Sequence, residues 1–185
     1  TDFPYYISGL WADPSRADQI NYRLDTMKSA TVEDMMSMQL DQTSQFAKDI
    51  LPYILETEEN KESKQVKRAF QFLKTWDFVE DVDSEAALVF NVIVKNLVFN
   101  LYGDEISLLG ESYLEAFSGI NYLITRKLRE DIKDGKSTWV DDVRTTNKRE
   151  EIREIIKSSV LDAISEIDQK FGGNWSNWKG GDAHS

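Results

Sequence analysis

The chain has 185 residues, with 33 acidic and 22 basic side chains, so its formal net charge at neutral pH is −11. Phosphate backbones and anionic membrane surfaces repel a protein this acidic, which argues against both as partners. The absence of cysteine excludes disulfides, thiolate catalysis and thiolate metal sites, and no apolar run approaches the roughly 18 residues of a membrane span.

Helical periodicity dominates the sequence and predicts a mainly α fold of about six helices in one domain, residues 1–185. The first residues, 1–12, are aromatic and turn-rich, and we expect them to be irregular. A helix then begins at Asp13 and Pro14 and runs to Ser29, because aspartate accepts backbone N–H bonds as a cap and proline suits the first helical position.

The next two helices are predicted from their start signals. Thr31 with Asp34 three residues later resembles a capping box, and the helix that follows should end or kink near Ile50, because proline removes a backbone hydrogen bond at position 52. A charged stretch separates it from a third helix over residues 63–76.

A fourth helix should begin at Asp83 or Ser84 and end at Tyr102, with Gly103 as its stop. It is apolar on nearly every side, which is typical of a centrally buried helix. Its β-branched residues would also suit a strand, but its length favours a helix. The few polar residues that interrupt it fall on one narrow stripe: Asn91, Lys95, Asn96 and Asn100.

A fifth helix is predicted over residues 105–132, followed by a turn at 134–136. The last helix should begin near Thr146 and end at Gly172, and residues 172–185 do not have helical character. The apolar face of this last helix consists of Ile152, Ile156, Val160, Ala163, Ile167 and Phe171.

Candidate chemistry is sparse. The single histidine, His184, is nearly terminal and is a weak catalytic candidate. An acidic run and an aromatic cluster each have two interpretations. The acidic run consists of Glu80, Asp81, Asp83 and Glu85. It is either a calcium site or, as we favour, negative charge at a helix N-terminus. The aromatic cluster consists of Phe3, Tyr5, Tyr6 and Trp11. It either lines a ligand pocket or, as we favour, belongs to the core.

Four segments, in order and spanning nearly the whole chain, resemble the β chain of the penicillin acylase family. They are Tyr5 to Ala17 (YYISGLWADPSRA), Thr31 to Pro52 with Gln39 and Asp41, Trp76 to Ala86, and Asn174 to Lys179 (NWSNWK). The resemblance implies an N-terminal-nucleophile hydrolase whose precursor cuts itself into two chains. The freed N-terminal serine attacks an amide, with its own α-amino group as general base, since the pKa of that group lies near 8.

The family fold is an αββα sandwich with helical insertions, so the resemblance implies that this chain is such an insertion. Residues 1–12 and 172–185 would join the sheet. The nucleophilic serine would lie upstream of Thr1, and we expect the chain alone to be inactive. Thr1 is itself a poor replacement, because Pro4 disfavours the strand that presents such a nucleophile.

The resemblance carries over one functional residue. Arg16 matches an arginine that lies near the nucleophile in the family, where it can hold an oxyanion-binding asparagine or the substrate. From its spacing alone, we favour Arg16 as an arginine in the first turn of a helix that makes a surface ion pair, and with the resemblance the two interpretations are evenly balanced. The family's calcium-binding aspartate corresponds to Tyr5, so we expect no cofactor or metal within this chain, while the full-length parent remains a candidate for calcium.

Two function classes remain open. The first is a fragment of a periplasmic bacterial amidohydrolase that acts on acylated amines, with the rest of the same precursor as its partner. The compartment rests on the resemblance alone. The second is a stand-alone, non-enzymatic helical module that binds another protein through its aromatic N-terminal segment.

Overall fold

The computed structural model describes residues 5–6, 12–59, 63–119, 121–172 and 178–179. These residues form eight α-helices and one short 3-10 helix, with no strand beyond an isolated bridge between Thr43 and Val79, so the predicted mainly α class is confirmed. The helices are α1 Ser15–Thr26, α2 Val32–Gln39, α3 Gln45–Leu55, α4 Lys64–Thr75, α5 Glu85–Leu108, α6 Glu111–Gly119, α7 Asn121–Asp134, η1 Thr138–Val140 and α8 Ile152–Phe171.

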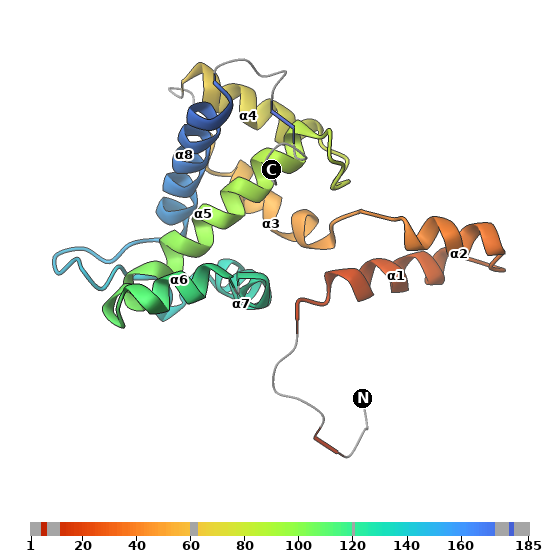
Figure 1. Cartoon of the computed structure of the whole chain (residues 1–185), viewed down its shortest axis with the longest axis horizontal. Helices are drawn as coiled ribbons and strands as arrows, with labels where there is room; N and C mark the ends of the chain where they lie inside the picture. Colours follow the sequence, from red (N-terminus) through yellow and green to blue (C-terminus); the bar gives the residue numbers. More distant parts are fainter. Residues whose placement is uncertain (1–4, 7–11, 60–62, 120, 173–177, 180–185) are drawn as a thin grey trace.

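Helix α5 is the centre of the core. It packs against α4, α6, α7 and α8, and α3 packs against α4, α7 and α8 around it (Figure 1). An 18-residue stretch of this 24-residue helix has a mean hydropathy of 1.4, enough by length and composition to cross a membrane, but more than half of that stretch is buried inside the structure. The prediction of a central, buried helix is therefore confirmed.

Three residues of the polar stripe of α5, Lys95, Asn96 and Asn100, face α8, whereas Asn91 donates to Glu80. Lys95 Nζ donates to Glu166 Oε1 at 2.6 Å, and Asn96 Nδ2 donates to Glu166 Oε2 at 3.1 Å. About one turn along, Asn100 Nδ2 donates to Asp162 Oδ2 at 2.9 Å. These bonds satisfy the polar groups at the closest helix pair of the bundle, so they fix how α8 aligns along α5.

Local start signals are confirmed. Thr31 and Asp34 form a reciprocal capping box, and the hydroxyls of Ser63 and Ser84 accept from the amides three residues further on. Helix α8 ends at Gly172, which has a positive φ of 71° that favours glycine.

The predicted helix from Thr31 to Ile50 is instead two helices. The chain leaves the helix at Leu40 and restarts at Ser44, because Thr43 pairs with Val79 and the Ser44 amide donates to the carbonyl of Phe78. The prediction that Pro52 ends a helix near Ile50 is wrong, because α3 continues to Leu55. Pro52 is exposed on the last turn, where water can satisfy the carbonyl that lacks its partner.

The prediction of a stop at Gly103 is also wrong. Helix α5 continues to Leu108, and the break comes at Gly110, whose φ is 113°. The predicted helix over 105–132 is therefore the end of α5 followed by α6 and α7. The last helix begins at Ile152 rather than near Thr146. At this observed start, Glu151 and Glu154 form a capping box.

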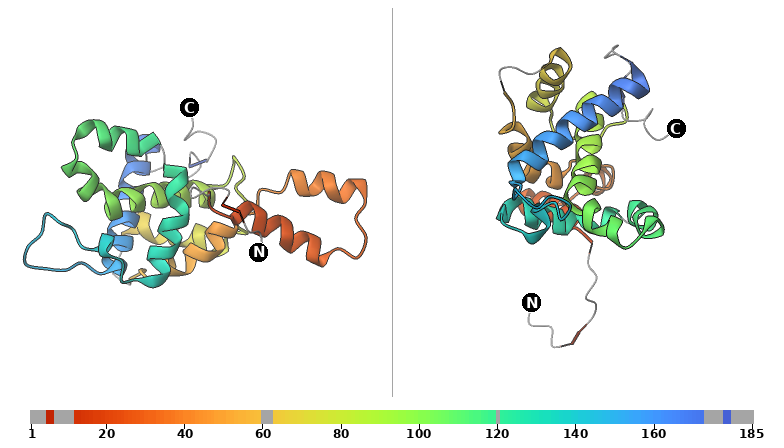
Figure 2. Two further views of the ribbon diagram at one scale, coloured as in Figure 1. Left: turned by 90° about the horizontal axis from the view of Figure 1, so that it is seen from below. Right: turned by 90° about the vertical axis from the view of Figure 1, so that its left-hand side faces the viewer.

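Helices α1 and α2 form a hairpin that projects from the bundle (Figures 1 and 2). Helix α1 ends at Thr26, three residues before the predicted end. Helix α2 presents apolar side chains to solvent at one-turn intervals: Val32 is 71% exposed, Met36 58% and Leu40 78%. In this hairpin, therefore, a row of apolar side chains is left uncovered by the rest of the fold.

Candidate functional site

Several sequence candidates lie outside the described residues: Thr1, Phe3, Trp11, His184 and residues 174–177 of the last family-like segment. Tyr5 and Tyr6 are described and strongly exposed, so the prediction that they belong to the core is wrong. At the other end, Trp178 is fully buried, and its indole N–H donates to the carbonyl of Gly172 at 3.2 Å. The C-terminal aromatic segment is therefore tied to the bundle at this residue.

The acidic run before α5 is dispersed among separate partners. Glu80 accepts from Asn91 at 2.7 Å, Asp83 pairs with Lys179 at 2.9 Å, and Glu85 lies in the first turn of α5. Within the described part of the chain, no group of three or more acidic or histidine side chains has a geometry that could hold a metal ion. The position of Glu85 in the first turn of α5 suits negative charge at a helix N-terminus.

Arg16 lies exposed on the first turn of α1 and reaches across to the end of α2. Its guanidinium donates to the backbone carbonyls of Met38 at 3.1 Å, Gln39 at 3.3 Å and Asp41. The carbonyls of Met38 and Gln39 belong to the last turn of α2, where a helix runs out of backbone donors and positive charge is stabilising. Arg16 thus caps α2 through backbone carbonyls, which is a different contact from the surface ion pair that its spacing suggested.

Asp41, immediately after α2, is the centre of the hairpin's polar network. It accepts from Gln19 at 2.7 Å, from Arg23 at 3.1 Å and from the amide of Thr43 at 2.9 Å. Burial alone would raise the pKa of Asp41, but the hydrogen bonds from Thr43, Gln19 and Arg23 more than offset it and hold the pKa well below its usual range. The carboxylate therefore joins α1 to the segment that leads into α3.

Asp41→Asn should weaken this junction by about 1–3 kcal/mol, because the amide loses the ion pair with Arg23 and one of its two acceptor oxygens. Because the pKa of Asp41 is lowered on folding, its contribution is present above about pH 4 and is lost as pH falls. Amide hydrogen exchange of residues 15–39 at pH 7 and pH 3 measures both effects. Asp25→Asn, an exposed change on α1 in the same hairpin, is the control. Equal exchange in both variants at pH 7 would contradict the assignment.

A first cavity, of about 570 Å³, opens between the start of α1 and α7, where Ala12, Pro14 and Ala17 face Arg126 and Glu130. Arg129 closes its inner side: it pairs with Asp13 at 2.9 Å and also contacts Ser15. The Asp13 carboxylate accepts the Ser15 amide at 2.9 Å, as predicted for this residue, but the helix begins at Ser15, so Pro14 rather than Asp13 is its N-cap.

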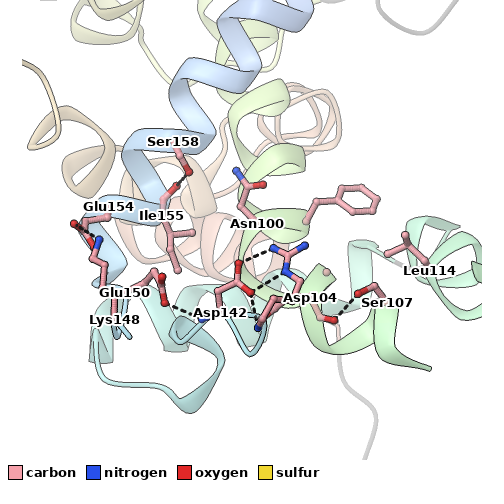
Figure 3. A pocket seen from close by; sticks show the side chains of 13 residues that line it. Asn100, Asp104, Ser107, Leu114, Asp142, Lys148, Glu150, Glu154, Ile155 and Ser158 are labelled. Carbon is pink, nitrogen blue, oxygen red and sulfur yellow. Dashed lines mark hydrogen bonds and ion pairs between the residues drawn. The ribbon is translucent and has the colours of Figure 1, made fainter. Parts of the chain in front are cut away.

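A second cavity, of about 520 Å³, lies between α5, α6, α8 and the loop that precedes α8 (Figure 3). Phe99, Leu114 and Ile155 line its apolar side, while Asn100 and Ser158 add polar groups. Its charged wall consists of Asp104, Asp142, Arg144, Lys148, Glu150 and Glu154.

Three carboxyl groups meet beside this second cavity. Asp104 is 5% exposed and accepts the Val143 amide at 2.8 Å. Burial, a hydrogen bond with Asp104 and the charges of Asp104 and Asp142 raise the pKa of Glu105 to about 7. Hydrogen bonds with Arg144 lower the pKa of Asp142 to about 2. Near neutral pH the cluster therefore holds an exchangeable proton on Glu105, which is a group able to donate or accept in this range.

Sequence reasoning missed this cluster, although one signal was present. Asp104 follows Leu97 and Leu101 at helical spacing, so it continues the buried face of α5 as a carboxylate. The partners Asp142 and Val143 lie 38 and 39 residues further on, and nothing local indicates that they fold back onto it.

No curated protein matches the chain. The family model described as penicillin amidase matches residues 1–185, the whole length of the chain. This match agrees with the four ordered segments that resemble the family, two of which lie on the projecting hairpin and in the segment between α4 and α5. The chain belongs to the penicillin amidase family.

Proposed function

We propose that the chain is the helical part of an amidohydrolase that cleaves the amide bond of acylated amines, and that the nucleophile lies outside residues 1–185. The observation that carries this proposal is the family match over the whole chain. It is supported by the all-helical architecture of the described residues, since an N-terminal nucleophile is presented by a sheet in this family. The sequence has no cysteine and a single histidine, His184, so it offers few alternatives.

In this proposal the chain is one helical domain that frames the active site. Residues 1–12 and 172–185 lead into the sheet, and the remainder of the same precursor is the partner. The periplasm is the compartment that the family resemblance implies, and calcium is left to parts of the parent other than this chain.

Arg16 is the residue that we propose to support catalysis. Its guanidinium is held at the end of α2 by three backbone carbonyls, and its planar fork leaves further N–H donors for a second set of acceptors. A positioned arginine of this kind can orient an oxyanion-binding side chain or the substrate. It is a positioning residue, because it acts through the groups that it holds.

The test compares two purified proteins with chromogenic phenylacetyl and fatty-acyl amides. Residues 1–185 alone should show no turnover above buffer, whereas the product of the complete reading frame should hydrolyse at least one of the amides. Robust turnover by residues 1–185 alone would overturn the assignment of the nucleophile. Inactivity of both proteins across a panel of amides would overturn the activity itself.

The second candidate is a non-enzymatic helical module that binds another protein. The exposed apolar stripe of α2, Val32, Met36 and Leu40, favours it, because an unpaired helix face of this kind suits a groove or sheet on a partner. The length of the parent reading frame discriminates the two. About 185 codons would favour the module, while several hundred codons upstream with a serine at a processing site would favour the hydrolase.

A further inference from the structure

The loop between η1 and α8, residues 141–150, is attached to the bundle at a few polar points. The buried carboxylate of Asp104 on α5 accepts the Val143 amide at 2.8 Å. At the far end, Lys148 pairs with Glu154 on α8 at 2.7 Å. Within the loop, Glu150 accepts the Asp142 amide at 3.0 Å. Figure 3 shows Asp142 and Glu150 beside the second cavity, so the loop forms one wall of it.

The contact between the loop and α5 brings like charges together. On α5 the carboxyl groups of Asp104 and Glu105 are adjacent, and the loop adds Asp142. The opposing cation is Arg144, which binds Asp142 through two bonds of 2.8 and 2.6 Å but is itself 65% exposed. The other charged groups that line this cavity are Lys148, Glu150 and Glu154. One solvent-exposed positive charge only weakly offsets the repulsion among three carboxylates. One of the three carboxyl groups should therefore stay protonated when the loop is docked.

Glu105 is the group placed to hold that proton. Its side chain is half-buried, and Oε2 is shielded from solvent with no hydrogen-bond partner in the structure. A shielded carboxylate oxygen without a partner is costly, whereas a neutral carboxyl can donate to Asp104. With that bond made, Oδ2 of Asp104 still accepts the Val143 amide.

We propose that residues 141–150 are a proton-controlled flap, which docks on α5 when Glu105 carries a proton and loosens, opening the cavity between α5, α6 and α8, when that proton is lost. The inference is independent of the proposed amidohydrolase activity, because it concerns only the movement of this loop.

The pH window follows from the two states of Glu105. In the docked state burial, Asp104 on the same helix and Asp142 of the loop raise the pKa of Glu105 to about 7. Loosening the loop removes the charge of Asp142 and part of the burial, so the pKa of Glu105 falls toward its ordinary value. Docking is therefore strongest at acid pH, weakens as pH rises toward 7, and is constant above. Asp142 does not interfere in this window, since its pKa of about 2 keeps it ionised throughout.

Amide hydrogen exchange of Val143 measures the docking directly, because this amide donates to Asp104. We expect its protection factor, corrected for intrinsic exchange, to fall by at least about tenfold between pH 5 and pH 7.5 and then to level off. Each unit of pKa difference corresponds to a factor of ten, and partial solvent exposure reduces the full effect. A protection factor that stays constant over this range would overturn the proposal.

Glu105→Gln distinguishes the effect of the proton from the effect of the side-chain shape, because glutamine has nearly the same shape as glutamate but does not titrate. Glutamine always donates to Asp104 and never ionises, so the protection factor of Val143 should be independent of pH and exceed the wild-type value at pH 7.5 by at least about tenfold. Glu111→Gln, an exposed change on α6, should follow the wild-type curve. A Glu105→Gln curve that follows the wild type would overturn the proposal.

A direct titration covers the case in which Glu105→Gln does not fold. The carboxyl carbon shift of Glu105, followed by NMR in the wild-type chain, should show a midpoint near 7. A midpoint near 4.5 would mean that docking of the loop does not depend on protonation of Glu105, and it would overturn the proposal.

Discussion

Leu97→Ala should lower the free energy of unfolding by about 2–5 kcal/mol, the largest stability loss that we expect from one conservative truncation in this chain. Leu97 is 0% exposed at the middle of α5, with α4 and α8 packed around this helix. Truncation removes its apolar contacts and leaves a cavity that a close-packed interior refills only in part. Since small domains are stable by about 5–15 kcal/mol, the loss should be plain in a urea titration.

Leu108→Ala is the matched control, because it is the same substitution on the same helix. Leu108 is 70% exposed at the last turn of α5, so its truncation should change the free energy of unfolding by less than about 0.5 kcal/mol. Leucine and alanine have similar helix propensities, and the difference between the two variants therefore reports burial. Similar losses in both would show that α5 is not the centre of the core.

Arg16→Lys should lower the turnover number of the full-length amidohydrolase by about a hundredfold, or about 3 kcal/mol of transition-state stabilisation. Lysine keeps the charge, but it lacks the planar fork that holds the α2 carbonyls and a second set of acceptors at once. The Michaelis constant should change little, because the loss concerns the positioning of reacting groups rather than ground-state binding.

Arg23→Lys is the control for a purely structural effect. Arg23 lies on the same helix and also donates to a carbonyl of α2, that of Ser37 at 3.1 Å. The two lysine variants should therefore weaken the hairpin to a similar degree, as a melting curve would record, while only Arg16→Lys lowers turnover. Wild-type turnover in Arg16→Lys would remove the catalytic role and leave Arg16 as a cap of α2.

The features that the sequence determined by itself are those with short-range causes. The capping box of Thr31 and Asp34 and the glycine that ends α8 each act within a few residues, so their side-chain chemistry is enough to predict them. The apolar face of α8 and the polar stripe of α5 follow from helical periodicity. That the stripe would meet α8 could not be predicted, because Lys95 and Glu166 are 71 residues apart.

Tertiary contacts decided the rest. The break at Leu40 to Ser44 depends on the pairing of Thr43 with Val79, and packing against neighbouring helices outweighs the low helix propensity of Gly103. The cluster of Asp104, Glu105 and Asp142 exists only because the loop folds back onto α5. Propensity and periodicity act along the chain, whereas burial and charge pairing depend on which distant segments meet, and that is known only once the chain has folded.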